Sequence, residues 1–344
     1  MRTKNSSFII HRSSLLSHWF YLLRATIWLA GAFARASRYF KNKALHDLEL
    51  PHPESLTSKE RRRLKHYFYG TTYLSAIFCL LRGHTRTRRE KHLFTNLAAL
   101  AYFFDDLVDT FRDRDTSGVL WQNNPEEYGQ TADERGLALH FLANVYRELP
   151  PGDRSEFQEF MHRVFNVETA GRQQTDAENL TINDLQKITA EKGGCSVLLF
   201  RRVLAHPLTA AEREALFQFG HLIQLCDDIF DLWFDREAGI CTLATVLVER
   251  NNVRHLTELF ENQYAATRLA FRAIPDFSGL QKETALRAVH FVVTVTRVCL
   301  RHYRALQKKH GNLPLTDRAQ MVVDMERWGN RLRAAYFLMM NDEW

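Results

Sequence analysis

The sequence is poor in residues that interrupt helices, with 8 prolines and 15 glycines among its 344 residues. It also lacks any sustained alternation of apolar and polar residues, which argues against a sheet of half-buried strands. Apolar residues instead recur at the three- and four-residue spacing of amphipathic helices in 93–108, 212–234 and 285–306. The one β-prone run, "FVVTVT" at 291–296, has helical flanks. The sequence therefore predicts an all-α fold.

Cysteine and histidine motifs are missing as well. The five cysteines are scattered, odd in number and form no CxxC pair, which argues against a zinc site and a disulfide framework. The fifteen histidines show no HExxH arrangement. This pattern is typical of a protein in a reducing compartment, so we expect a cytoplasmic protein.

Acidic residues do not balance the basic ones: the net charge is +6 and the isoelectric point is near 9.1. Such an excess suits a polyanionic ligand or an anionic membrane surface. The basic runs "RRRLKH" and "RTRREKH" carry no nucleic-acid-binding motif and are typical of solvated helix faces. No nucleic-acid partner is therefore expected.

Residues 1–48 differ from the rest in being apolar, aromatic and then basic. As a helix the apolar part is barely long enough to cross a bilayer, and Arg24 would lie in the middle of the span at a cost. "AFA" before Arg35 resembles a signal-cleavage site, but the apolar core is split. We expect an amphipathic helix on a membrane or protein surface, leaving a true span, a signal and a misread start open. "ELPHPES" at 49–55 is the clearest break, so the predicted catalytic domain is 49–344.

Two DDxxD motifs stand within apolar helical segments. The first contains Asp105, Asp106 and Asp109. The second contains Asp227, Asp228 and Asp231, and Asp235 follows four residues later. From average residue usage, two such motifs arise by chance in well under ~1% of chains this long. Chance is therefore a poor explanation.

The spacing of these aspartates suggests their chemistry. Residues four apart share one helix face, with about 5–6 Å between their Cβ atoms. Carboxylate oxygens suit Mg²⁺, which commonly shares them with substrate phosphates. If the two helices face each other across a cavity, two or three Mg²⁺ ions, or Mn²⁺ in their place, could hold a diphosphate between them. The predicted metal ligands are Asp105, Asp106, Asp109, Asp227, Asp228, Asp231 and Asp235.

The two motifs, about 120 residues apart, resemble those of the class I isoprenoid synthases, which include trans-prenyltransferases, squalene and phytoene synthases and class I terpene cyclases. The resemblance implies a single-domain helical bundle with a central active-site cavity. The segment 171–200 is similar to the mid-chain region of prenyltransferases, with Gln173, Asp176 and Lys192 at the matching positions. It implies that Lys192 binds diphosphate and that Gly193–Gly194, in "EKGG", is a helix break lining the pocket.

Weaker candidates for diphosphate binding are Gln173, Arg172 and Arg301, the last in an approximate match ("RHY") to an Arg-Tyr pair of cyclases. Two departures separate the subfamilies. The Arg-Arg pair that follows the first motif in prenyltransferases is replaced by "TFRDRD", and their upstream Gly-Lys-Arg element is not evident. The second cluster fits the i, i+4, i+8 register of cyclases, although all three positions are Asp. These departures favour a reaction of one substrate, whereas the Gln–Asp–Lys segment favours condensation.

Three functions remain open. The leading one is a Mg²⁺-dependent class I terpene synthase-like enzyme that ionises an allylic prenyl diphosphate, acting as a lyase or cyclase. The alternative is a prenyltransferase that condenses two prenyl substrates, by chain elongation or head to head as in squalene and phytoene synthases. The third is a catalytically silent member that binds a partner or lipid. Peripheral membrane contact through 1–48 is expected, and a homodimer is left open.

Overall fold

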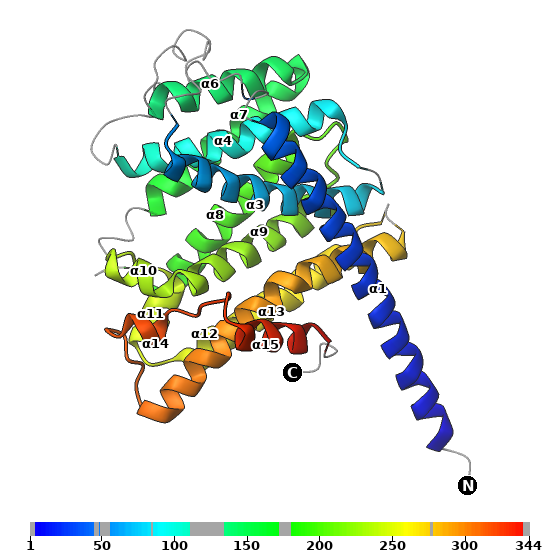
Figure 1. The fold of residues 1–344 in the computed structure, drawn as a ribbon, viewed down its shortest axis with the longest axis vertical. Coiled ribbons are helices and arrows are strands. Elements are labelled where there is room, and N and C mark those ends of the chain that lie inside the picture. The colour runs from blue at the N-terminus through cyan, green and yellow to red at the C-terminus, as the bar shows by residue number, and fades with distance from the viewer. Residues whose placement is uncertain are drawn as a thin grey trace. The chain divides into compact units, whose positions relative to one another are not determined.

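The computed structural model is built from helices, as the sequence predicts, and no described residue forms a strand (Figure 1). The structure describes residues 4–44, 48, 56–83, 85–110, 134–171, 180–275 and 278–339. The β-prone run at 291–296 lies inside α13 (Gly279–His310), where its residues are helical like their flanks. The all-α prediction is confirmed over these residues.

The contacts between Cα atoms divide the chain into two compact units. Unit 1 contains Met1–Ile27, Gly171–Gly194 and Ala210–Trp344, and unit 2 contains Trp28–Ala170 and Cys195–Thr209. This division follows contacts and not sequence composition, so the separation of 1–48 from 49–344 stays a prediction.

Unit 2 is a set of helices around α4. Its elements are the second part of α1 (Lys4–Tyr39), the π-helix η1 (Phe40–Ala44), α3 (Ser58–Arg82), α4 (Arg88–Thr110), α6 (Glu134–Glu148), α7 (Pro151–Gly171) and the end of α8 (Ile182–Arg202). The helix α4 packs against both α3 and α6. Its apolar stripe, which includes Phe94, Leu97 and Phe103, is buried in this packing, as the three- and four-residue spacing predicts.

Unit 1 is centred on three long helices. Its elements are the first part of α1, the first part of α8, α9 (Ala210–Phe230), α10 (Leu232–Glu237), α11 (Leu243–Glu249), α12 (Val253–Arg272), α13, α14 (Arg318–Met321) and α15 (Trp328–Met339). The helices α9, α12 and α13 pack against one another, and α15 packs on α13. Ser278 caps α13 and Thr242 caps α11, each by a reciprocal capping box.

The N-terminal helix α1 changes character along its length. Before Trp28 it exposes Trp19, Phe20, Leu23 and Ile27. From Trp28 onward it packs within unit 2, where the Trp28 indole N–H donates a hydrogen bond to the Ala76 carbonyl oxygen at 3.3 Å. In the part of the chain that the structure describes, no helix is long and apolar enough to cross a membrane.

One expectation about the helices is wrong. The sequence "EKGG" predicts a break at residues 191–194, but α8 runs without interruption from Ile182 to Arg202. Two consecutive glycines in a helix cost about 1 kcal/mol each relative to alanine. Their use is found in the packing of α8 on α9, described below.

Candidate functional site

The second aspartate motif lies where α9 ends and α10 begins. Asp231 is the residue between the two helices, yet the backbone keeps the helical hydrogen bonds through it. The Asp231 N–H bonds the Asp227 carbonyl oxygen at 2.8 Å, and the Asp235 N–H bonds that of Asp231 at 2.8 Å. Because the i to i+4 pattern continues across the junction, Asp227, Asp231 and Asp235 lie on one face, as their spacing predicts.

Asp228 has a different environment from the other three. It is buried, with 6% of its surface exposed, whereas Asp227 and Asp231 are exposed and Asp235 is half-buried. The Gln224 side-chain amide donates to one Asp228 carboxylate oxygen at 3.0 Å, and the Thr189 hydroxyl donates to the other at 3.2 Å. Asp228 thus ties α9 to α8. Metal binding by Asp228 stays a prediction, and a metal ion would share these oxygens with Gln224 and Thr189.

The aspartates raise one another's pKa values. Although part of Asp227 remains exposed, desolvation of its carboxylate, followed by repulsion from Asp228 and Asp231, raises its pKa to about 7. Desolvation and the charges of the same cluster raise the pKa of Asp235 to about 7 as well. Carboxylates that are desolvated and held near one another are costly to ionise together. The cluster would therefore bind a proton or a cation favourably.

Lys192 supplies positive charge to this cluster. Its attraction lowers the pKa values of Asp227, Asp228 and Asp235, against the larger effects of desolvation that raise them. Lys192 is half-buried on α8, one turn from Thr189. The sequence predicts a role for Lys192 beside a diphosphate, and the structure brings it into electrostatic range of the second motif.

Helices α8 and α9, labelled in Figure 1, contact each other through glycines next to Lys192 in the sequence. A Cβ atom added to Gly193 would clash with the Gly220 carbonyl oxygen and lie 2.8 Å from the Gln224 Cβ. A Cβ on Gly194 would collide with the Phe217 ring. The two helices therefore touch backbone to backbone. Gly193 and Gly194 act in packing and do not break the helix, which corrects the sequence-based expectation.

The first motif lies in unit 2. Asp105, Asp106 and Asp109 are helical, near the end of α4, as the sequence predicts. Their side chains lie outside the described residues, and so do Arg172, Gln173 and Asp176. The convergence of the two motifs on one diphosphate, and the central cavity that it requires, stay predictions.

Arg301 and Tyr303, both in the "RHY" segment, contact different helices. The Arg301 guanidinium lies over the Phe337 ring of α15, 5.6 Å from its centroid. Tyr303 contacts α9 instead, and its hydroxyl donates a hydrogen bond to the Ile229 carbonyl oxygen at 3.3 Å. Burial raises the pKa of Tyr303, and the charge of Asp231 raises it further. Diphosphate binding by Arg301 stays a prediction, while Tyr303 is the residue of "RHY" that reaches the aspartate helix.

Sequence reasoning also missed Gln224 and Thr189. Both are ordinary polar residues on helices, and only the crossing of α8 and α9 brings them to Asp228. The glycines of the sequence were a signal of this close contact between helices. Gly193, Gly194 and Gly220 all lie within apolar helical segments, where paired small residues indicate close helix contact.

The donor chemistry of the second motif fits Mg²⁺, since carboxylate oxygens on one helix face are typical ligands for this ion. Among the described residues, however, no group of three or more His, Cys, Asp or Glu side chains is arranged to hold one metal ion. The first motif's carboxylates are outside that search. Metal binding shared between the two motifs therefore stays a prediction.

Comparison with known proteins gives little further information. No family profile and no curated protein match the sequence. A geranyltransferase from Legionella pneumophila has a similar structure, with 14% sequence identity and a TM-score of 0.45, covering 83% of this chain and 99% of that one. A similarity this weak does not identify a function.

Proposed function

We propose that the protein is a Mg²⁺-dependent enzyme that processes a prenyl diphosphate in the manner of class I isoprenoid synthases. One observation carries this proposal: Asp227, Asp231 and Asp235 share a helix face, and Lys192 attracts Asp227 and Asp235 electrostatically. Carboxylates beside a fixed ammonium group suit a ligand that brings both metal ions and phosphate oxygens. A merely solvated helix face does not explain the buried Asp228 or the close crossing of α8 and α9.

The reaction begins with heterolysis of the bond between the allylic carbon and the diphosphate oxygen. The electron pair leaves with the diphosphate, and the prenyl chain becomes a carbocation. Bound Mg²⁺ would supply positive charge that stabilises the leaving diphosphate. Lys192 donates a hydrogen bond to the same group, and this interaction strengthens as negative charge develops.

The remaining residues of the cluster position this machinery. Gln224 donates to both Asp227 and Asp228, with distances of 3.3 and 3.0 Å, so it fixes one carboxylate relative to the other. Thr189 holds Asp228 from the side of α8, only three residues before Lys192. This network keeps the carboxylates in a fixed position relative to the Lys192 ammonium group.

Two fates of the carbocation distinguish the finer proposals. Loss of a proton, cyclisation or quenching by water defines a terpene synthase-like lyase, and the i, i+4, i+8 register of the aspartates favours this reaction. Attack by a second prenyl substrate defines a condensing prenyltransferase. The Gln–Asp–Lys pattern of the sequence, to which Lys192 belongs, favours the latter reaction.

The test uses purified protein and Mg²⁺ with geranyl, farnesyl and geranylgeranyl diphosphates, each with and without isopentenyl diphosphate. Gas chromatography detects hydrocarbons, and liquid chromatography detects diphosphates. A volatile product from one diphosphate alone identifies a terpene synthase. A longer diphosphate that requires isopentenyl diphosphate identifies an elongating enzyme, and a head-to-head hydrocarbon identifies a squalene or phytoene synthase-like enzyme.

The controls separate a real activity from a contaminant. The variant Asp227→Asn should lose turnover, whereas Glu214→Gln, which changes an exposed carboxylate on the same helix α9, should retain it. Absence of every product from folded protein would overturn the proposed function. Equal turnover in the Asp227→Asn variant would also overturn it.

A further inference from the structure

A cavity of about 430 Å³ lies within unit 2, between the second part of α1, η1, α3 and the start of α4. Five basic residues line it, and its described lining includes no acidic residue. The basic residues are Arg35, Arg38, Lys43, Arg86 and Lys91. This volume falls within the range typical of small-molecule sites.

Two of these basic groups repel each other inside the cavity. Arg86 is half-buried, and its guanidinium lies over the Phe94 ring, 5.8 Å from the centroid. Removal from water lowers the pKa of Arg86, and repulsion from the nearby Arg35 lowers it further. Repulsion between two positive groups at one cavity is unfavourable, and an anion bound between them would reduce this penalty.

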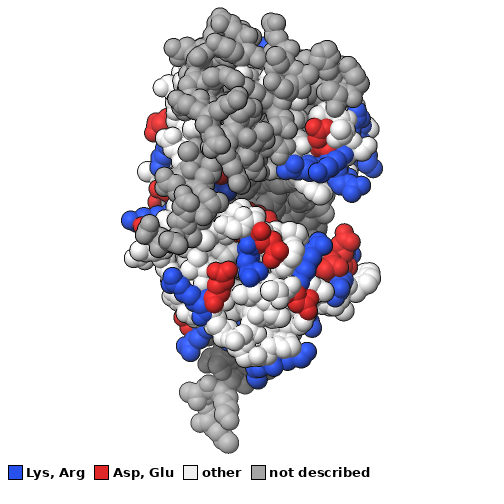
Figure 2. Space-filling view, turned by 90° about the vertical axis from the view of Figure 1, so that its left-hand side faces the viewer, with Lys and Arg blue, Asp and Glu red and all other residues white. Residues whose placement is uncertain are grey.

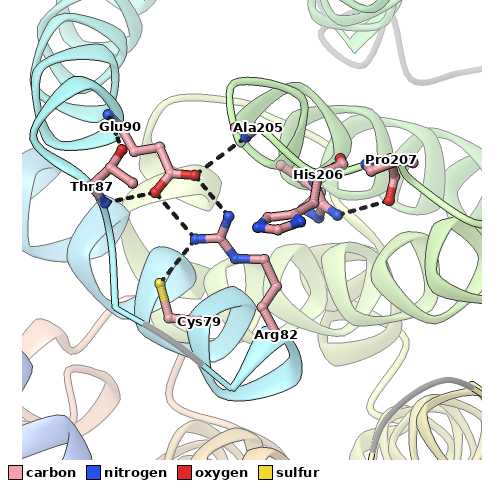
Figure 3. A network of polar contacts seen from close by, with 8 residues as sticks. Cys79, Arg82, Thr87, Glu90, Ala205, His206 and Pro207 are labelled. Atoms are coloured by element: carbon pink, nitrogen blue, oxygen red, sulfur yellow. Dashed lines mark hydrogen bonds and ion pairs between the residues drawn. The ribbon is translucent and has the colours of Figure 1, made fainter.

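Glu90, an acidic residue that acts on Arg86 electrostatically, hydrogen-bonds other groups (Figure 3). One of its oxygens accepts hydrogen bonds from Arg82 at 2.7 Å and from the Ala205 N–H at 3.2 Å. The other accepts from Arg82 at 3.3 Å and from the Thr87 N–H at 2.8 Å. Glu90 attracts Arg86 electrostatically, but its hydrogen-bonding capacity is used by these donors. It therefore does not neutralise the cavity.

Most of the remaining lining is apolar or aromatic. Trp28, Ala36 and Phe68 form part of the wall, and the Trp28 ring is fixed by its hydrogen bond to the Ala76 carbonyl oxygen. The π-helix η1 brings Asn42 and Lys43 to the cavity. Short π-helical segments are rare and frequently occur at functional sites.

We propose that this cavity binds an amphiphilic anion: a phosphate or diphosphate ester that carries a hydrocarbon chain. Arginine guanidinium groups bind phosphate oxygens through paired hydrogen bonds, and Arg35 and Arg86 provide two such groups. The apolar wall receives the chain. The ligand can come from a soluble alkyl diphosphate or from an acidic phospholipid, which share this chemistry. All the lining residues belong to unit 2, so the inference goes beyond the proposed function and does not depend on it.

Calorimetric titration with n-decyl diphosphate tests the proposal. The protein carries Asp227→Asn and Asp231→Asn, and EDTA is present, so that the proposed catalytic cluster does not contribute. We expect saturable binding, weaker binding of inorganic pyrophosphate and no binding of decanol. Co-sedimentation with phosphatidic acid or phosphatidylcholine vesicles then distinguishes a soluble ligand from a lipid headgroup.

The decisive comparison is between Arg35→Gln and Arg88→Gln. Both arginines are exposed, but only Arg35 lines the cavity. Arg35→Gln should weaken binding at least tenfold, and Arg88→Gln should leave it unchanged. A second variant, Arg86→Gln, should act like Arg35→Gln, with circular dichroism to check its fold. Equal affinity in the Arg35 and Arg88 variants, or no binding of either decyl diphosphate or acidic vesicles, would overturn the proposal.

Discussion

Gly193 of α8 and Gly220 of α9 face each other with no space for a side chain on either one. Each carbonyl group occupies the position that a Cβ on the other glycine would need. This contact fixes the crossing of the two helices. Lys192 directly precedes Gly193, and Gln224, which also faces Gly193, donates a hydrogen bond to Asp228. Local packing thus sets the distance between the ammonium group and the carboxylates.

The first prediction concerns this contact. Gly193→Ala and Gly220→Ala should each destabilise the protein by about 1–3 kcal/mol, because overpacking forces backbone shifts. Urea unfolding would measure the change. The matched control is Gly70→Ala in α3, where an added Cβ meets nothing within 4 Å; this change should stabilise by up to about 1 kcal/mol. If Gly193→Ala behaves like the control, the crossing is not tight.

The same contact shows what sequence could predict and what it could not. The helical faces of Asp227, Asp231 and Asp235 were predictable, because their spacing and the apolar period are local properties of the chain. The role of Gly193–Gly194 was not, because glycines inside a helical pattern are compatible with a break or with a close helix contact, and the sequence does not identify the partner helix. The hydrogen bonds of Asp228 to Gln224 and Thr189 also depend on which helices meet.

The cavity of unit 2 is another feature that sequence analysis did not find. Its basic residues are distributed over α1, η1, the segment before α4 and α4 itself, and the sequence run that contains Arg86 and Lys91 is typical of a solvated helix face. Only the packing of α1 on α3 gathers them around one space.

The face drawn in Figure 2 carries Lys and Arg side chains close to Asp and Glu in its described part, so on that face no continuous basic track is seen among the described residues.

The second prediction concerns Lys192. Lys192→Gln should lower kcat by about 10²–10³, the effect of removing one donor that stabilises developing negative charge. Lys192→Arg, which keeps the charge on a different geometry, should retain more activity. Steady-state kinetics with the substrate found in the product assay would measure both. A rise in KM alone, with kcat unchanged, would contradict this role.

The third prediction concerns pH and metal. The folded pKa values of Asp227 and Asp235, about 7, lie above their unfolded values near 3.9. The folded state therefore binds more protons between these values, so the metal-free protein should lose stability as pH rises from about 4 to about 7. Mg²⁺ would replace those protons and should raise Tm more at pH 8 than at pH 5.5.

Differential scanning fluorimetry at four pH values, with Mg²⁺ or EDTA, would measure this dependence. Asp227→Asn should reduce both the pH dependence and the Mg²⁺ effect. A Mg²⁺ effect equal at all pH values, or unchanged in this variant, would exclude the cluster as the metal site.

The fourth prediction concerns the ion pair between Arg82 and Glu90, which are 3% and 2% exposed. Although burial alone would raise the pKa of Glu90, hydrogen bonds from Arg82, Thr87 and Ala205 lower it to about 2. Glu90→Gln leaves a buried guanidinium without its counter-charge and should cost about 3–5 kcal/mol. Unfolding by urea would measure this loss.

The pair also predicts a pH effect. The folded pKa of Glu90 lies below its unfolded value near 4.3, so its stabilisation is present above that value and is lost as pH falls toward 2. Glu258→Gln is the control, since Glu258 pairs with Arg254 on the surface of α12, and it should not measurably change stability. Similar losses in the two variants would contradict the importance of burial.

The last prediction concerns the exposed apolar residues of α1. Leu23 and Ile27 lie four apart on one face, and Trp19 and Phe20 precede them by about one turn. Such a row can insert into a lipid interface and would account for the expected peripheral membrane contact. Leu23→Gln combined with Ile27→Gln should reduce co-sedimentation with acidic vesicles and leave Tm unchanged, because neither side chain is buried.

Leu269→Gln, at an equally exposed leucine of α12, should have no effect on sedimentation. Equal sedimentation of the α1 and α12 variants would assign membrane contact to another surface, and a lower Tm of the α1 variant would show that this face packs against protein.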